Sequence, residues 1–178
     1  MTKKELRELI RGRKKQHTTE QLQSYSQSIE HSLLERIARE ENCHTILLYH
    51  SLPDEVNTHD LIQTLYAQGY TVLLPSVVGN DLALHVYEGE QVMNAGSSFG
   101  IQESQGALFT DYSKIDLAVI PGMAFTQQGD RLGRGKGFYD RLLPKLHCPL
   151  IGIAFPFQIL PVIPTEQHDI PMTELISC

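Results

Sequence analysis

A glycine-rich, positively charged segment at residues 129–141 holds the residue types best suited to chemistry. Its sequence, Gly-Asp-Arg-Leu-Gly-Arg-Gly-Lys-Gly-Phe-Tyr-Asp-Arg, sets Arg131, Arg134 and Lys136 among glycines. Glycines let the backbone curl so that successive N–H groups bind phosphate oxygens, and the cations add full positive charge. The spacing matches neither a P-loop nor a Rossmann fingerprint. The density of glycines and cations favours a polyphosphate site over the alternative, a surface loop with incidental charge.

A second group of cations lies at the N-terminus. Seven of the 15 Lys and Arg residues fall within residues 1–15, in a chain of 178 residues with a formal net charge of −6. If the two basic segments meet in space, an anionic ligand would be held between them. Taken alone, the N-terminal segment is better explained as a solvated helix face. Mild overall acidity argues against a general polyanion binder, so no nucleic-acid partner is expected.

Four other side chains are candidates for the same site. Asp140 lies in the first turn of a predicted helix, where it either offsets the helix dipole or holds Mg²⁺ against phosphates. Asp169 is a second carboxylate, with a solvated turn as the alternative. His50 and Glu55 follow a predicted strand and could line a pocket. The alternatives are a structural histidine and an N-terminal charge for the next helix. The histidines show no metal-ligand spacing, and no catalytic triad is suggested.

Alternating helical and strand patterns must position these residues. Helices are predicted at 3–16, from a cap at Thr18 or Thr19 through Ile37, at 58–68 and near 137–146; strands are predicted at 45–49, 71–74, 82–87, 116–120, 150–154 and near 174–176. Pro75 is expected to stop the second strand, and 89–112 to form a long loop with one short element. This order predicts one α/β domain over residues 1–178, with a mostly parallel sheet covered on both faces. Ligands of such sheets bind beyond the carboxyl ends of the strands.

The compartment is predicted from the cysteines and the apolar segments. Three scattered cysteines form neither a disulfide framework nor a zinc motif. The most apolar stretch, 148–164, carries four prolines, too many for a membrane-spanning helix. The N-terminus has no hydrophobic segment of a signal peptide. A cytoplasmic protein without a membrane partner is expected.

The segments 121–125 and 129–141 resemble the signature of the 5-formyltetrahydrofolate cyclo-ligase family, also called 5,10-methenyltetrahydrofolate synthetases. Weaker matching motifs follow in family order: Lys3 with Arg7, Leu-Pro-Asp-Glu-Val at 52–56, Phe-Gly-Ile-Gln-Glu at 99–103 and Glu-x-His-Asp at 166–169. Two positions depart from the family pattern, since Phe138 replaces a usual tyrosine and Ser104 a common proline. The resemblance implies a three-layer α/β sandwich of the sugar-phosphate-isomerase and CoA-transferase type. It also implies ATP- and Mg²⁺-dependent cyclisation of 5-formyltetrahydrofolate through a phosphorylated formyl group.

The resemblance also implies roles for individual residues. ATP would be bound by Lys3, Arg7, Arg131, Leu132, Gly133, Arg134, Gly135, Lys136, Gly137, Phe138 and Tyr139; the folate by His50, Glu55, Phe99, Arg134, Gly135, Lys136, Gly137 and Phe138; and Mg²⁺ by Asp140 and Asp169. Arg134 and Lys136 would stabilise the transferring phosphoryl group. A monomer is expected. The alternatives are a folate- or nucleotide-binding regulator without activity, and a sugar-phosphate isomerase or CoA transferase on the same fold.

Overall fold

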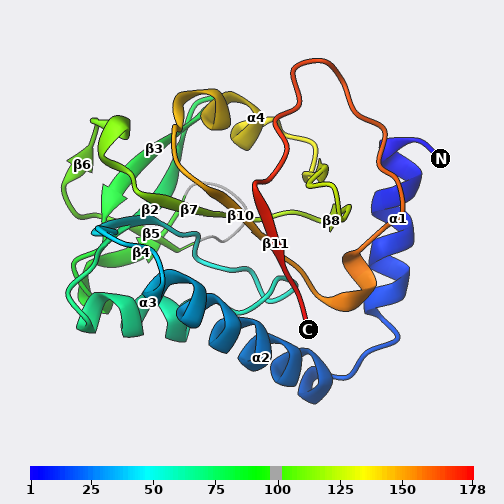
Figure 1. Ribbon diagram of the computed structural model, residues 1–178, viewed down its shortest axis with the longest axis horizontal. Helices are drawn as coiled ribbons and strands as arrows, with labels where there is room; N and C mark the ends of the chain where they lie inside the picture. Colours follow the sequence, from blue (N-terminus) through cyan, green and yellow to red (C-terminus); the bar gives the residue numbers. More distant parts are fainter. Residues whose placement is uncertain (97–101) are drawn as a thin grey trace.

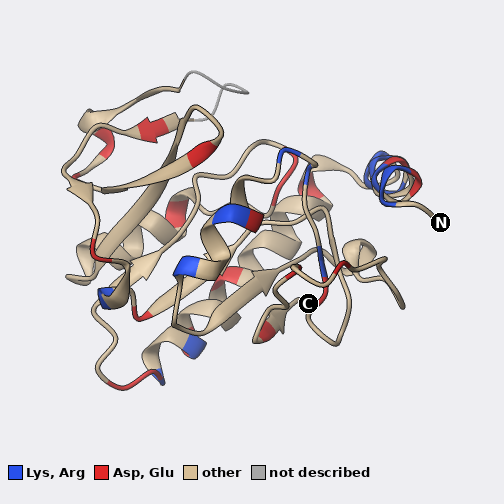
Figure 2. Ribbon diagram, turned by 90° about the horizontal axis from the view of Figure 1, so that it is seen from above, with Lys and Arg blue, Asp and Glu red and all other residues tan. Residues whose placement is uncertain are grey.

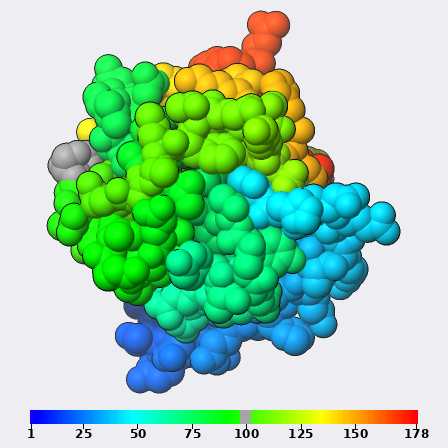
Figure 3. Space-filling model, turned by 90° about the vertical axis from the view of Figure 1, so that its left-hand side faces the viewer, coloured from blue at the N-terminus to red at the C-terminus, as the bar shows by residue number. Residues whose placement is uncertain are grey.

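The computed structural model describes residues 1–96 and 102–178, and its centre is a seven-stranded sheet (Figure 1). In spatial order the strands are β11 (Glu174–Ile176), β10 (Leu150–Ile153), β7 (Leu117–Ile120), β1 (Thr45–Leu47), β2 (Thr71–Val78), β3 (Asp81–Val86) and β6 (Leu108–Phe109). The first five run parallel, whereas β3 and β6 are antiparallel to their neighbours. Figure 3 shows the molecule from the side at which β6 forms the edge of the sheet. The segments coloured cyan to green cover this side. The prediction of a mostly parallel sheet is confirmed.

Helices cover the sheet on both faces. Helices α2 (Thr19–Ala38) and α3 (His59–Ala67) lie on one face, and α4 (Phe138–Leu142) lies on the other (Figure 1). Successive strand residues point to opposite faces, and the two apolar cores follow that alternation. Ile46 and Val72 belong to the core beneath α2 and α3, whereas Leu47 and Leu73 belong to the core that includes α4. The expected three layers are therefore present.

Helix α1 (Lys3–Lys14) packs outside these layers, against a small hairpin. Thr2 and Glu5 form the predicted capping box at its start. Leu6 and Ile10 are buried against β8 (Ala124–Phe125), β9 (Arg131–Leu132) and neighbouring residues. The sequence analysis did not predict this hairpin, which branches from the segment after β7. It brings the N-terminal helix to the glycine-rich segment.

The expectation that Pro75 ends its strand is wrong, because β2 continues to Val78. The N–H of Tyr87 donates to the carbonyl of Val72, so the hydrogen-bonded pairs with β3 fall on even-numbered residues of β2. The backbone nitrogen of Pro75 therefore points away from β3, toward the side of β1. Strand β1 has already ended at Leu47, so among the described residues no strand lies there to accept a hydrogen bond. Proline therefore costs no hydrogen bond of the sheet here.

Two other predicted elements differ from the structure. The described part of 89–112 is not a plain loop, since it contains η1 (Glu90–Val92), the pair β4 (Met93–Ala95) and β5 (Gln102–Ser104), and β6. These strands are too short for periodicity to identify. Helix α4 has five residues and passes into η3 (Leu143–Lys145) instead of reaching 146. Pro144 has no N–H with which to continue the helix.

Two further observations concern the predicted compartment and folate site. Within 1–96 and 102–178, no helix combines the length and apolar character needed to cross a bilayer. Cys43, Cys148 and Cys178 are free thiols. Phe99, a predicted folate contact, lies outside the described residues.

Candidate active site

One pocket collects the residues that the sequence singled out. It is lined from α1 by Lys3 and Arg7, from the segment after β1 by His50 and Glu55, and from the glycine-rich segment by all residues from 131 to 140. Asp169 lines it as well. Figure 2 shows the blue cations of α1 at the right of the molecule, with further blue segments along the chain facing it. The two basic segments therefore meet.

Helix α1 is tied to the glycine-rich segment by a direct hydrogen bond. Arg7 Nε donates to the carbonyl of Gly133 over 2.8 Å. A side chain at Gly135 would meet the Arg7 guanidinium at 3.4 Å, so the backbone passes close under that group. Gly135 and Gly137 have φ of 100° and 73°, which disfavours side chains at both positions. Two of the glycines are therefore required by the local backbone, and the segment is not a freely varying surface loop.

Arg131 is a buried brace within this segment. Its side chain is only 7% exposed, and its Nη2 lies 2.7 Å from Oδ1 of Asp140. Its Nη1 donates to the carbonyl of Pro121 over 3.0 Å, and its guanidinium lies 5.6 Å from the ring centroid of Tyr139. The contacts join the end of β7 to the start of α4. Burial lowers the pKa of Arg131, against the neighbouring carboxylate of Asp140.

Lys3 links α1 to the segment before β11. Its Nζ lies 3.0 Å from Oδ2 of Asp169 and 3.3 Å from Oε1 of Glu166. Burial lowers the pKa of Lys3, but hydrogen bonds to the two carboxylates outweigh that effect and raise it. The same Oδ2 accepts the backbone N–H of Glu166. This carboxylate is held by its own turn as well as by α1.

Arg134 reaches across the pocket to the segment after β1. Its Nη2 lies 2.6 Å from Oδ1 of Asp54 and 3.0 Å from Oε1 of Glu55. Lys14 Nζ stands 3.9 Å from Oδ2 of Asp54. Burial would raise the pKa of Asp54, yet the hydrogen bond from Arg134 and the charge of Lys14 outweigh it and lower that pKa. Glu55 is further fixed by the N–H of Leu52, which donates to Oε2 over 2.9 Å.

Lys136 stands at the outer part of the glycine-rich segment. It is exposed and lines the pocket. Arg141 supports this part of the backbone, since its Nη2 donates to the carbonyl of Lys136 over 3.2 Å. The Arg141 guanidinium lies 5.7 Å from the centroid of the Phe138 ring. The ring at the position that departs from the family pattern is therefore packed against a cation.

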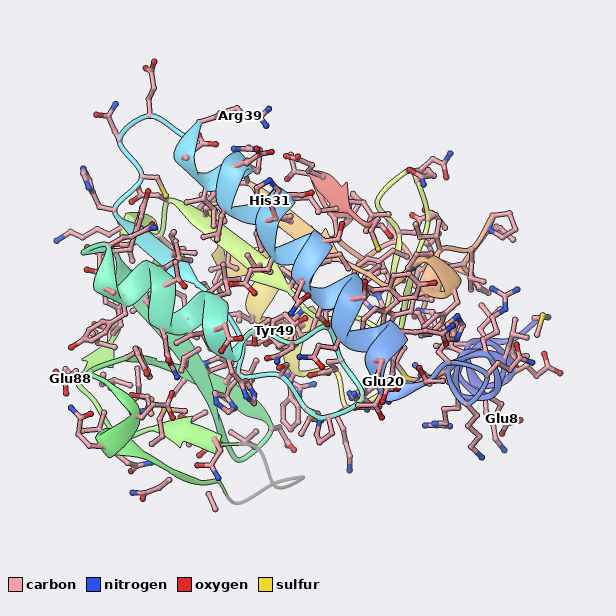
Figure 4. The ribbon with its side chains drawn as sticks, turned by 90° about the horizontal axis from the view of Figure 1, so that it is seen from below. Glu8, Glu20, His31, Arg39, Tyr49 and Glu88 are labelled. Atoms are coloured by element: carbon pink, nitrogen blue, oxygen red, sulfur yellow. The ribbon has the colours of Figure 1, made fainter. Side chains whose placement is uncertain are left out.

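One part of the pocket lining, the apolar wall, is rich in carbon. It is lined by Tyr49, Leu52, Pro75, Val77 and Leu82. His50 lies beside them, and burial together with the charge of His59 lowers the pKa of His50 to about 4. Tyr49 is buried beneath α2, where Figure 4 labels it near the middle of the molecule. The apolar wall offers an imidazole and carbon surface, in contrast to the cations of α1 and the glycine-rich segment.

The two candidate magnesium ligands fit an ion that arrives with a polyphosphate. Asp140 and Asp169 both line the pocket, and each is paired with a cation of the same site. No group of three or more His, Cys, Asp or Glu side chains suited to a metal is present in the described part of the chain. Mg²⁺ in nucleotide sites is commonly held by one or two carboxylates plus phosphate oxygens. The donors present suit that arrangement.

The sequence analysis gave no role to several residues of the site. Asp54 and Glu166 stand beside residues that were singled out, and only their tertiary ion pairs reveal them. Glu103 is buried in β5, lines the pocket and accepts the N–H of Val77 over 2.9 Å. Ser104, at the second departure from the family pattern, is buried and donates to the carbonyl of Val86. The matching motifs contain Asp54, Glu103 and Glu166, but the contacts that these side chains make depend on the fold.

Comparison with known proteins identifies the family of this chain. The family model of the 5-formyltetrahydrofolate cyclo-ligases matches residues 1–177. The Escherichia coli (strain K12) 5-formyltetrahydrofolate cyclo-ligase is 30% identical, over 95% of this chain and 96% of that protein. The Haemophilus influenzae protein of the same name is 31% identical, over 98% and 96% of the two chains.

Solved structures give the same result. The NMR structure of Aquifex aeolicus 5,10-methenyltetrahydrofolate synthetase has a TM-score of 0.85 and 29% sequence identity, and the match covers 99% of this chain and 89% of that one. The synthetase structure from Mycoplasma pneumoniae has a TM-score of 0.82 and 25% identity, and the match covers 99% of both chains. With a family match over nearly its full length, the chain belongs to the 5-formyltetrahydrofolate cyclo-ligase family and is an enzyme of the ligase class.

Proposed function

We propose that this protein closes 5-formyltetrahydrofolate to 5,10-methenyltetrahydrofolate, using ATP and Mg²⁺ and releasing ADP and phosphate. The observation that carries the proposal is the hydrogen bond between Arg7 and the carbonyl of Gly133. It brings the N-terminal cations and the glycine-rich segment to one pocket. A polyphosphate requires such converging donors. The family assignment supplies the substrate class.

The cationic side of the pocket is proposed to hold ATP. Lys3, Arg7, Arg134 and Lys136 face it from two elements, and the backbone from Gly133 to Gly137 supplies N–H groups. Arg131 is proposed to act mainly through the backbone, because its buried guanidinium is already engaged by protein groups. Asp140 and Asp169 would hold Mg²⁺, which supplies charge neutralisation to the phosphates when bound.

The apolar wall is proposed to hold the folate. Leu52, Pro75 and Leu82 offer carbon surface to a planar heterocycle, and His50 and Glu55 offer polar atoms beside it. Phe138 lines the same pocket. The formyl group would then lie toward Arg134 and Lys136.

Charge placement explains how such a site could run the reaction. The formyl oxygen attacks the γ-phosphorus of ATP, the bond to ADP breaks, and N5 donates its electron pair to form a phosphorylated iminium. N10 attacks that carbon and loses its proton, and the carbon–oxygen bond breaks to release phosphate. Phosphoryl transfer depends on positioning and charge stabilisation rather than on a protein nucleophile. Arg134 and Lys136 are proposed to stabilise the negative charge of the transferring group.

The test is the near-ultraviolet absorbance of the methenyl product. Purified protein is mixed with 5-formyltetrahydrofolate, ATP and Mg²⁺, and parallel mixtures omit one component each. An absorbance rise that requires all three would support the proposal. Folded protein that binds ATP and the folate without product would overturn it and favour a binding protein that has lost catalysis.

A further inference from the structure

Two histidine rings stack behind the apolar wall of the pocket. The ring centroids of His50 and His59 are 3.9 Å apart, and the ring planes differ by 21°. His50 follows β1 and lines the pocket, whereas His59 is the first residue of α3 and is not among the lining residues. The stack therefore joins a residue that lines the pocket to one that supports it from outside the lining.

The backbone around both rings is locked by buried hydroxyl groups. The N–H of Ser51 donates to Oγ1 of Thr58 over 3.1 Å, and the N–H of Thr58 donates to Oγ of Ser51 over 3.0 Å. The Thr58 hydroxyl in turn donates to the carbonyl of Tyr49. Reciprocal buried hydrogen bonds of this kind favour one geometry. The residues before and after His50 are consequently held against the start of α3.

The His59 ring is oriented by a hydrogen bond of its own. Its Nε2 lies 2.9 Å from the carbonyl oxygen of Ser51. A carbonyl only accepts, so Nε2 carries the hydrogen. The plane of the ring is thereby set by a contact to the residue that follows His50.

The His50 ring is left open toward the pocket. In the described portion of the chain, no hydrogen bond engages either of its nitrogens. Burial and the charge of His59 lower the pKa of His50, while the carboxylate of Glu90 acts in the opposite sense. A neutral imidazole offers one donor and one acceptor, whereas imidazolium offers donors only. The neutral form suits the alternating donors and acceptors at the edge of a pterin ring.

We propose that His59 is a positioning residue that holds the His50 imidazole in one orientation against the folate. The proposal rests on the proposed function in one respect, the presence of folate on this side of the pocket. His59 itself touches no substrate in this arrangement. Its effect is transmitted through the ring stack and the Ser51 carbonyl.

The test compares His59→Ala and His59→Phe with a surface control, His31→Ala. His31 lies on the outside of α2 and its side chain is 76% exposed (Figure 4). We expect His59→Ala to lower kcat/KM for 5-formyltetrahydrofolate by roughly ten- to a hundredfold, as misplacement of a binding group does, with KM for ATP within twofold. His59→Phe, which keeps a ring in the stack, should recover most of the loss. His31→Ala should behave as the unaltered protein.

A second readout needs no turnover. NMR signals of ¹³C-labelled histidine, assigned by their loss in His50→Gln, report the titration of His50. In the unaltered protein this ring should stay neutral to about pH 5, since its pKa lies at about 4. In His59→Ala its pKa should rise toward the ordinary value near 6.5.

Three results would overturn the proposal. One is a His59→Ala protein whose His50 titration and folate KM match those of His31→Ala. Another is a parallel rise of both KM values, which would indicate general loss of the pocket. If the unaltered protein binds folate without product, the proposed function fails, and the NMR titration with equilibrium folate binding still decides the role of His59. Failure of the unaltered protein to bind folate at all would overturn both proposals.

Discussion

The two sides of the pocket are held by different forces. On the cationic side, Lys3, Arg131 and Arg134 are each paired with carboxylates at distances of 2.6–3.3 Å. On the apolar side, His50 is held by its ring stack with His59 and by two reciprocal hydrogen bonds between Ser51 and Thr58. Under the proposed function, phosphates would replace protein carboxylates as partners of these cations, whereas a folate ring would meet a wall that is already formed. The difference predicts that variants of the first side change the reaction rate and that variants of the second change folate affinity.

The largest effect expected is that of Lys136→Ala. If Lys136 stabilises the transferring phosphoryl group, kcat should fall by roughly a hundredfold or more, because charge stabilisers of a transition state typically contribute that much. His50→Gln should instead raise KM for the folate with a smaller change in kcat. Steady-state kinetics with both substrates measure the contrast. Lys145→Ala, an exposed lysine of η3, is the matched control, and near-normal kcat in Lys136→Ala would remove Lys136 from the mechanism.

Arg131→Met tests whether the cationic side depends on its buried brace. The Arg131 side chain is only 7% exposed, and the variant loses its hydrogen bonds to Asp140 and to the carbonyl of Pro121. We expect the free energy of unfolding to fall by about 2–4 kcal/mol, since charge-assisted hydrogen bonds are lost at a buried site. Urea denaturation measures it.

Arg39→Met is the control for the brace. Arg39 lies on α2, its side chain is 74% exposed, and it should stay within about 0.5 kcal/mol of the unaltered protein (Figure 4). Equal stabilities of Arg131→Met and Arg39→Met would show that the Arg131 contacts do not hold the segment. Retained stability with weakened ATP binding would assign Arg131 directly to the nucleotide.

Much of this architecture was predictable, because local chemistry marks it. Thr2 and Thr18 form the capping boxes that start α1 and α2, and apolar runs identify β1, β7 and β10. The continuation of β2 through Pro75 was not predictable. It depends on where the neighbouring strand ends, which is a property of the sheet and not of the segment.

The candidate site also has a part that the sequence predicts and a part that it does not. The glycine-rich segment is continuous in sequence, so its residue types and spacing predict a phosphate site directly. The ion pair of Lys3 with Asp169 joins residues 166 positions apart, and the stack of His50 on His59 joins two elements. Pairing of this kind requires the register of helices on the sheet, which one sequence does not display. Family resemblance named Asp169 and His50, but their partners came from the fold.

Asp140→Asn tests the carboxylates of the cationic side at intermediate strength. The substitution keeps an oxygen that can accept from Arg131 and removes the negative charge proposed to hold Mg²⁺. The Mg²⁺ concentration for half-maximal rate should rise about tenfold or more, with the folate KM little changed. Asp81→Asn, at the exposed ion pair with Arg141, is the control. An unchanged Mg²⁺ requirement would leave Asp140 as a partner of Arg131 only.

The smallest effects separate the two sides by pH. The pKa of His50 is lowered to about 4 in the folded protein. As pH falls, His50 therefore takes up its proton more readily in the unfolded chain than in the folded one. The free energy of unfolding should decrease for this reason between about pH 6.5 and pH 4. The pKa of Asp54 is lowered as well. Its stabilising contribution is present above the unfolded value near 3.8 and is lost only as pH falls below it.

The free energy of unfolding should therefore decline in two separate pH ranges, and a different variant should abolish each decline. His50→Gln should flatten the decline between pH 6.5 and 4, on the order of 1 kcal/mol once solvent screening is considered, and leave the acid window intact. Asp54→Asn should do the reverse, with a smaller change because 41% of the Asp54 side chain is exposed. Urea denaturation across pH 3–7 measures both. If Asp54→Asn instead changes the stability above pH 5, the two sides of the pocket are coupled. The apolar wall is then not independent of the ion pairs of the cationic side.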